Sequence, residues 1–194
     1  MQIGTLVALV AVLLLPPVAG QASTLPNCDV ESYPLGPGGA RDMRRANLAG
    51  CDLSGAMLEA ADLRRADLTG AILDDADLNA ANLVRAKLAG ASLDSTQLND
   101  ADLSHADLQG AQMQVAALND ANLNRADLRG AQLSLTGLNG ANLTHALLSN
   151  ATIAISGFNG ANLTKASLLG ATITTSGLRR RISGRSISSS VLPL

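Results

Sequence analysis

A strict five-residue period runs through this chain from Met43 to Leu178. Every fifth residue in that span is Leu, Met, Ile or Phe, and a small residue lies two positions earlier, with Arg41 as the one bulky exception. An α-helix needs apolar residues at intervals averaging 3.6, and a half-buried strand needs them at intervals of two. A period of five fits neither. It indicates a solenoid, in which each unit buries its apolar residue only by stacking on its neighbours.

A second period, of twenty residues, is superimposed on the first. The second pentapeptide of each row of twenty ends in Gly or Asn, at Gly50, Gly70, Gly90, Gly110, Gly130, Asn150 and Gly170. These residue types adopt positive φ at the least cost, so one specific turn is expected at that corner. Asparagines that can bond along the axis recur in the fourth pentapeptide, at Asn79, Asn99, Asn119, Asn139 and Asn159. One coil is therefore four pentapeptides around a square prism.

The repeated A-[D/N]-L-x-x pattern resembles the pentapeptide repeat family over residues 41–178. The resemblance implies an all-β fold, a right-handed four-sided parallel β-solenoid of about seven coils here, with the central Leu and the preceding small residue pointing inward. The composition agrees with a narrow interior filled by Leu and Ala, because the chain has one Tyr, one Phe and no Trp.

Residues 1–22 are predicted to be a signal peptide, because an apolar run is followed by prolines and small residues. Cleavage is expected near Gly20/Gln21 or Ala22/Ser23. The alternative is an uncleaved anchor, but the apolar run is shorter than the roughly 20 residues that cross a bilayer. We therefore expect export to a periplasm, a thylakoid-lumen-like compartment or the cell exterior, with no transmembrane span in the mature chain.

The mature chain is expected to have three parts. Residues 23–40 are rich in Pro and Gly and are predicted to form an irregular cap over the first coil of the solenoid, which occupies residues 41–180. The basic and Ser-rich segment 181–194 is either a solvated tail or a C-terminal cap that folds back over the last coil. Exposed strand edges at an open end would allow a weak end-to-end homodimer.

Two cysteines suggest a covalent link between cap and solenoid. Cys51 occupies an inward small-residue position in the first coil, and Cys28 lies in the segment that is expected to cover that coil. In an exported chain this placement predicts a disulfide. The alternative is that Cys51 is a free, buried apolar residue.

No pattern of catalytic or metal-binding residues is present. His105 and His145 hold the same position two coils apart, about 10 Å along the axis, which is too far for one metal ion. Neither a ligand-spaced cluster, a Ser–His–Asp set, a P-loop nor a dinucleotide-binding glycine pattern occurs. We expect a non-enzymatic protein without a metal or cofactor.

Two outward columns are the candidate partner surfaces. The first closes the first pentapeptide of each row and is called the basic ladder: Arg45, Arg65, Arg85, His105, Arg125, His145 and Lys165. Asp67, Asp107 and Asp127 stand beside it and are expected to neutralise part of its charge, which would make it an ordinary solvated face. The second is called the apolar column and contains Val115, Leu135 and Ile155 on an exposed corner.

The charge is uneven along the chain. Residues 21–127 carry a balance of −8 and residues 128–194 a balance of +6, which together give the net charge of −2. We expect an exported structural or protein-interaction element with an unknown protein or anionic partner. The family resemblance offers an alternative, a cytoplasmic DNA mimic that binds DNA gyrase. The export signal, the small net charge and the basic C-terminal half oppose it, and no sequence-specific nucleic-acid partner is expected.

Overall fold

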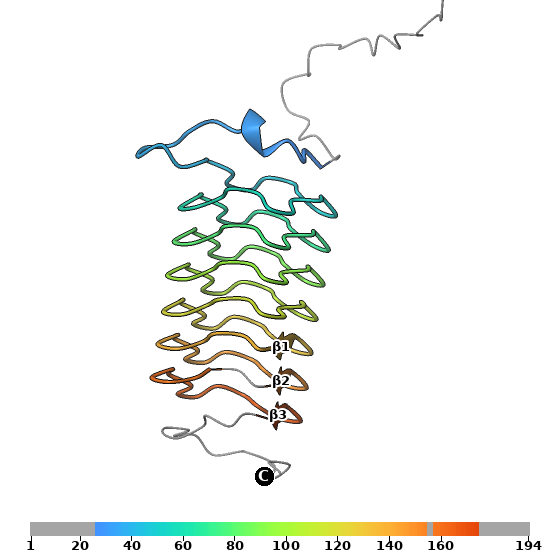
Figure 1. Cartoon of the computed structure of the whole chain (residues 1–194), viewed down its shortest axis with the longest axis vertical. Helices are drawn as coiled ribbons and strands as arrows, with labels where there is room; N and C mark the ends of the chain where they lie inside the picture. The colour runs from blue at the N-terminus through green and yellow to red at the C-terminus, as the bar shows by residue number, and fades with distance from the viewer. Residues whose placement is uncertain (1–25, 155–156, 175–194) are drawn as a thin grey trace, which may run out of the picture.

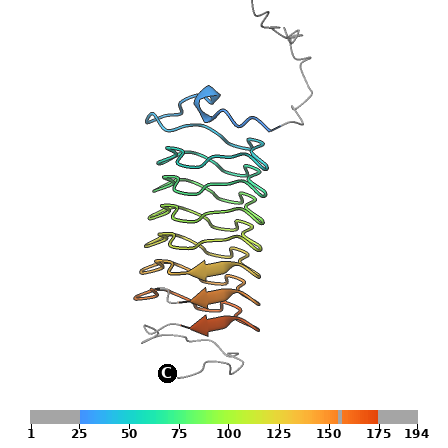
Figure 2. The same cartoon turned by 45° about the vertical axis from the view of Figure 1, so that its right-hand side comes forward.

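The computed structural model describes residues 26–154 and 157–174, which wind into a four-sided rod of stacked coils (Figure 1). Its regular elements are a short 3-10 helix, η1 (Val30–Ser32), and three strands, β1 (Gln132–Ser134), β2 (Thr152–Ala154) and β3 (Thr172–Thr174). The strands form one sheet in the order β1-β2-β3 at the C-terminal end of the described rod (Figure 2). The other sides of the rod are joined by isolated parallel bridges.

Successive coils pair in parallel with an offset of twenty residues. Leu133 of β1 pairs with Ile153 of β2, which pairs in turn with Ile173 of β3. The isolated bridges keep the same offset, as in the pair of Asp62 with Asn82. The predicted four-sided parallel β-solenoid, with four pentapeptides in each coil, is confirmed.

The interior of the rod is formed by the central Leu and the small residue two positions before it. Leu103 and Ala101, in the middle of the rod, are both 0% exposed. Thr96 and Thr136 replace Ala at two inward positions and are also buried. Their hydroxyls donate to the carbonyls of the coil before, at 2.8 Å for Thr96 and 2.6 Å for Thr136, so neither polar group is buried without a partner.

Every described pentapeptide ends in a residue with positive φ, so the left-handed turn recurs at all four corners. We predicted this turn only for the corner that carries Gly or Asn, and that prediction was too narrow. Arg65 has a φ of 60° and Val115 a φ of 60°. The inter-coil ladder favours this conformation, because the backbone N–H of Arg65 donates to the Val84 carbonyl in the next coil at 3.0 Å. Glycine is thus the most frequent residue at one corner, but no corner requires it.

The Asp or Asn before each central Leu stabilises the turn that follows it. The Oδ1 atom of Asp62 accepts a hydrogen bond from the backbone N–H of Arg64, two residues later, at 3.3 Å. The same bond is made by Asp or Asn at positions 42, 47, 52, 67, 77, 82, 102, 107, 122, 127, 142 and 162. Short side chains that accept from the backbone two residues on are typical of such turns. The Asp or Asn at the second position of the repeat therefore stabilises the fold.

Residues 26–40 lie across the N-terminal end of the rod (Figure 1). Val30 and Tyr33 pack against the core of the first coil. The guanidinium of Arg41 forms an ion pair with Glu31 and donates to the carbonyls of Glu31 and Tyr33, at 2.8 Å and 3.0 Å. These bonds explain why the bulky Arg41 occupies an inward position in the first repeat: its side chain binds residues of the cap. The expected signal peptide at 1–22 and the segment 181–194 lie outside the described residues.

Candidate partner-binding surface

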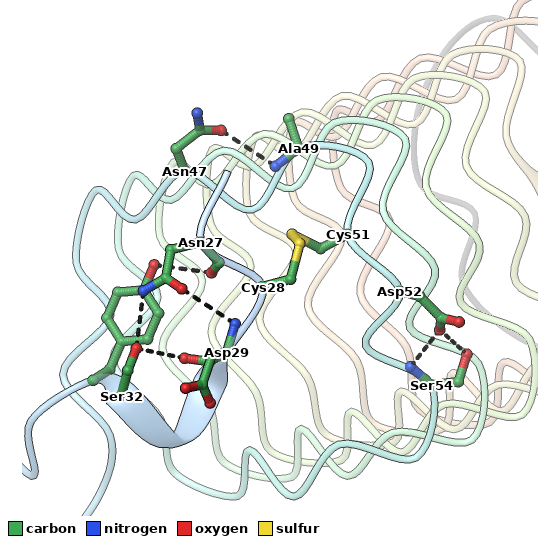
Figure 3. Close-up of a disulfide and its surroundings, with 10 residues drawn as sticks. Asn27, Cys28, Asp29, Ser32, Asn47, Ala49, Cys51, Asp52 and Ser54 are labelled. Atoms are coloured by element: carbon green, nitrogen blue, oxygen red, sulfur yellow. Dashed lines mark hydrogen bonds between the residues drawn. A yellow bond between two sulfur atoms is a disulfide. The ribbon is translucent and has the colours of Figure 1, made fainter. Parts of the chain in front are cut away.

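The cap is joined to the first coil by a disulfide. The Sγ atoms of Cys28 and Cys51 are bonded at 2.02 Å, and the Cα atoms are 5.4 Å apart (Figure 3). Nearby, the backbone N–H of Asn27 donates to the carbonyl of Asn47 at 3.0 Å. The side chains of Asn27 and Ser32 are also hydrogen-bonded to each other, at 2.9 Å. The covalent link therefore sits within a network that fixes the cap on the end of the rod.

The basic ladder stands on one corner of the rod, and all seven of its side chains are exposed. Its members end successive first pentapeptides, so each lies one coil from the next, about 4.8 Å along the axis. The backbone N–H of Arg45 donates to the Arg64 carbonyl and that of Arg65 to the Val84 carbonyl, both at 3.0 Å. The spacing of the charged side chains is therefore fixed by the inter-coil hydrogen bonds.

The neighbouring carboxylates do not pair with the basic ladder, contrary to our expectation. Asp67 forms its ion pair with Lys87 at 2.9 Å, and Asp127 with Arg129 at 2.6 Å. Among the described residues, the ion pairs involve no member of the ladder. In both aspartates, Oδ1 accepts from the backbone N–H of the turn that follows, and Oδ2 pairs with Lys87 of the next coil or with Arg129 of that turn.

The first three coils place a groove beside the N-terminal end of the ladder. It has a volume of about 740 Å³ and is lined by Pro34, Asp42, Arg44, Arg45, Arg64, Arg65, Val84 and Arg85. We call it the arginine groove. Pro34 belongs to the cap and the other residues to the solenoid, so the groove lies where cap and rod meet.

Two of the five arginines in the groove are neutralised by aspartates. Arg44 pairs with Asp42 at 2.5 Å and lies 3.7 Å from Asp62, and Arg64 pairs with Asp62 at 2.5 Å. Hydrogen bonds from Arg44 and Arg64 hold the pKa of Asp42 and of Asp62, respectively, below the usual range of a carboxyl. Both aspartates therefore stay charged, and three guanidinium groups remain in the groove without an ion pair.

Sequence reasoning missed this groove, although one signal for it was present. The pairs Arg44-Arg45 and Arg64-Arg65 repeat twenty residues apart, which predicts two stacked rows of arginines. What could not be read from the sequence was that Asp42 and Asp62 neutralise only the first arginine of each pair. The contribution of Pro34 from the cap was equally hidden, because residues 23–40 have no repeat to fix their position.

The apolar column is exposed where the structure describes it. Val115 and Leu135 are each 55% exposed, and both have positive φ, 60° and 58°. This backbone conformation is unusual for a β-branched residue such as Val. Ile155 lies outside the described residues. The role of this column as a partner surface stays a prediction.

Within residues 26–154 and 157–174, no three side chains of His, Cys, Asp or Glu come together as a metal site. Over the same residues, no helix is long and apolar enough to cross a bilayer.

The sequence profile of the pentapeptide repeats matches residues 42–79, 81–114 and 116–150, in eight copies. The chain is a pentapeptide repeat protein. It has the fold of that family, a right-handed four-sided β-solenoid, as the resemblance implied. The family match and the coil geometry agree on the same residues.

Solved structures of pentapeptide repeat proteins are similar to this one. HetL, from the cyanobacterium Nostoc sp. strain PCC 7120 and involved in heterocyst differentiation regulation, is 37% identical, with a TM-score of 0.57 over 68% of this chain and 69% of its own. Rfr23 of the cyanobacterium Cyanothece 51142 is 34% identical, with a TM-score of 0.41 over 57% and 62%. A thylakoid-lumen protein of Arabidopsis thaliana is 35% identical, with a TM-score of 0.31 over 61% and 65%. No match was found among curated protein sequences.

Proposed function

We propose that this pentapeptide repeat protein is a non-enzymatic binding rod, which acts outside the cytoplasm and presents its basic ladder to an anionic partner. One observation carries the proposal. Seven cationic or protonatable side chains stand exposed on one corner at successive coils, and in the described part of the chain none of them has a carboxylate partner. Charges left unpaired at a fixed spacing favour a contact with an extended anion.

The strength of this contact follows from the number of free charges. A cation near an anionic surface contributes about 1 kcal/mol, and added salt screens it. Five members of the ladder are Arg or Lys, so a weak contact that depends on salt is expected. Affinity for an extended partner would rise through several simultaneous contacts, as in other multivalent interactions.

Membership of the pentapeptide repeat family is compatible with a role in binding. HetL, a member that is 37% identical to this chain, is involved in the regulation of heterocyst differentiation. A rod with a regular charged edge is suited to binding a partner.

The alternative function is a cytoplasmic DNA mimic that binds DNA gyrase. Such a mimic needs free carboxylates along the rod. Here the net charge is only −2, and the chain has no Asp or Glu after Asp127, so the C-terminal part of the rod carries no acidic surface. A supercoiling assay separates the two functions: we expect no inhibition of DNA gyrase by the full chain. Inhibition at stoichiometric concentrations would favour the alternative.

The test of the proposed function combines location and binding. Cells that express the full chain are fractionated, and the mass of the recovered protein is measured. Binding of that protein to immobilised polyglutamate is then followed at low and at physiological salt. We expect a mature chain that lacks residues 1–22 in an exported fraction, and binding that weakens as salt is added. Cytosolic protein that retains Met1, or no binding at low salt, would contradict the proposal.

A further inference from the structure

The arginine groove differs from the rest of the basic ladder. Arg45, Arg65 and Arg85 line an open hollow together with Pro34 and Val84, and its volume of about 740 Å³ is large enough for a small ligand. Beyond Arg85 the ladder continues on the outside of this hollow, and two of its four further members are histidines. The groove therefore concentrates the permanent positive charge of the ladder in one concave place.

The three arginines are held by a rigid backbone. Their φ angles are 59°, 60° and 59°, and each backbone N–H donates to a carbonyl of the next coil at 3.0 Å. The guanidinium groups thus start from equivalent positions one coil apart. Binding of a ligand therefore has to order the arginine side chains but not the backbone that carries them.

The fold itself does not require arginine at these positions. The left-handed conformation is less favourable for Arg than for Gly, and the next corner of the same coils carries Gly50, Gly70 and Gly90. The side chains of Arg45 and Arg65 also make no ion pair, in contrast to those of Arg44 and Arg64. The three arginines therefore add charge and hydrogen-bond donors to the surface without an evident gain for folding.

The chemistry of the lining selects the kind of ligand. Guanidinium groups donate hydrogen bonds and accept none, and Asp42 already accepts from Arg44. A peptide or a neutral sugar brings donors of its own, for which Asp42 is the one side-chain acceptor among the lining residues. The groove also has no aromatic side chain among its lining residues, so it offers no surface on which a nucleic-acid base could stack. A group with several acceptor oxygens and no donor, such as a phosphate, matches this lining.

We propose that the arginine groove binds closely spaced phosphate groups, as in a short inorganic polyphosphate, through Arg45, Arg65 and Arg85. This deepens the proposed function, because the same three residues belong to the basic ladder. The concave shape favours a small free polyphosphate over the flat surface of a bilayer. Lipid phosphates are the other source of this chemistry, and the experiment below distinguishes them.

The experiment measures the binding of sodium tripolyphosphate to the mature protein, with its disulfide intact, by titration calorimetry at low salt. Arg65→Gln and Arg85→Gln remove one donor group each from the groove. Arg125→Gln is the matched control, because it changes an exposed ladder arginine at the same corner outside the groove. Melting curves confirm that each variant is folded. We expect Arg65→Gln and Arg85→Gln to weaken binding about tenfold each, as expected for one charged hydrogen bond, and Arg125→Gln to change it less than twofold.

The possible outcomes separate the groove from the ladder as a whole. If the three variants weaken tripolyphosphate binding equally, the groove is not a distinct site, although the ladder can still bind polyglutamate. If tripolyphosphate does not bind to the wild type, the groove proposal is wrong whatever polyglutamate does. In a parallel arm, vesicles that contain phosphatidylglycerol are tested for binding and for competition by tripolyphosphate. Binding to vesicles without any binding of tripolyphosphate would overturn the proposal in favour of a lipid surface.

Discussion

The side chain of Asn99 donates from Nδ2 to Oδ1 of Asn79 in the preceding coil at 3.0 Å, and its backbone N–H donates to the same oxygen at 2.9 Å. The same two bonds join Asn119 to Asn99 and Asn139 to Asn119, and Asn159 donates its backbone N–H to Asn139. The expected asparagine stack therefore exists, and each amide oxygen ties its own coil to the next.

Asn99→Ala should lower the free energy of unfolding by about 1 to 2 kcal/mol. The change leaves the half-buried backbone N–H of Asn119 and its side-chain amide without their acceptor, which costs about that amount. Gln114→Ala is the control, because its side chain is exposed. The measurement is urea unfolding followed by circular dichroism. Equal midpoints for the two variants would show that the stack does not stabilise the rod.

Leu103→Ala should cost about 2 to 5 kcal/mol, as the removal of a buried side chain does when the surroundings cannot collapse. Leu103 is 0% exposed in the middle of the rod, whereas Gln109 in the same coil points outward and is half-buried. Gln109→Ala should therefore change the melting temperature very little. Equal shifts for the two variants would contradict the assignment of inward and outward positions.

The fold could be predicted because each inward position repeats the same physical requirement. Leu103 and Ala101 belong to a pattern that never changes phase, and only a chain that turns every five residues buries all of its members. The placement of Cys28 relative to Cys51 followed from the need to cover the first coil. The five-residue period thus determined which residues point inward, and the twenty-residue period determined the number of residues in a coil.

The candidate site was less predictable, because the sequence does not show which cation or N–H group each surface carboxylate will bind. The sequence placed Asp67 beside Arg65, but the carboxylate of Asp67 accepts from Thr69 and pairs with Lys87 of the next coil. Likewise, the recurrence of glycine predicted the left-handed turn at one corner, but nothing in the sequence predicted it at the other three. At those corners the inter-coil hydrogen bonds impose positive φ on residues such as Val115, whatever their own preference.

The disulfide between Cys28 and Cys51 should stabilise the protein by about 3 kcal/mol, since it closes a loop with a sequence separation of 23 residues. The mass of the non-reduced protein should be two hydrogens lower than that of the reduced protein, and a reducing agent should lower the melting temperature. Two thiols that can be alkylated without reduction, in protein from an oxidising compartment, would contradict the bond.

The stability of the rod should fall as the solution becomes acidic. The hydrogen bond from Arg129 lowers the pKa of Asp127, and that from Arg64 lowers the pKa of Asp62. A carboxyl whose pKa is lower in the folded protein contributes stability above its unfolded pKa of about 3.9, and this is lost as the pH falls through the folded value. Stability should therefore decrease below about pH 4.

Asp127→Asn isolates one part of this effect. The amide oxygen can still accept from the backbone N–H of Arg129, as Asn122 does for Asn124, but the ion pair is lost. Urea unfolding between pH 2 and pH 7 should show a smaller decrease for the variant than for the wild type. Parallel curves would mean that Asp127 does not contribute to the acid sensitivity.

The most direct test of the basic ladder is binding of the mature protein to polyglutamate at pH 7, at low and at physiological salt, with and without charge reversal. Arg65→Glu, Arg85→Glu and Arg125→Glu are combined in one variant, whose folding is checked by its melting curve. The wild type should bind, and less tightly as salt is added, because five members of the ladder are Arg or Lys and salt screens their charges. The variant should lose binding at both salt concentrations. Unchanged binding by the variant, or no binding by the wild type at low salt, would show that the ladder is an ordinary solvated face.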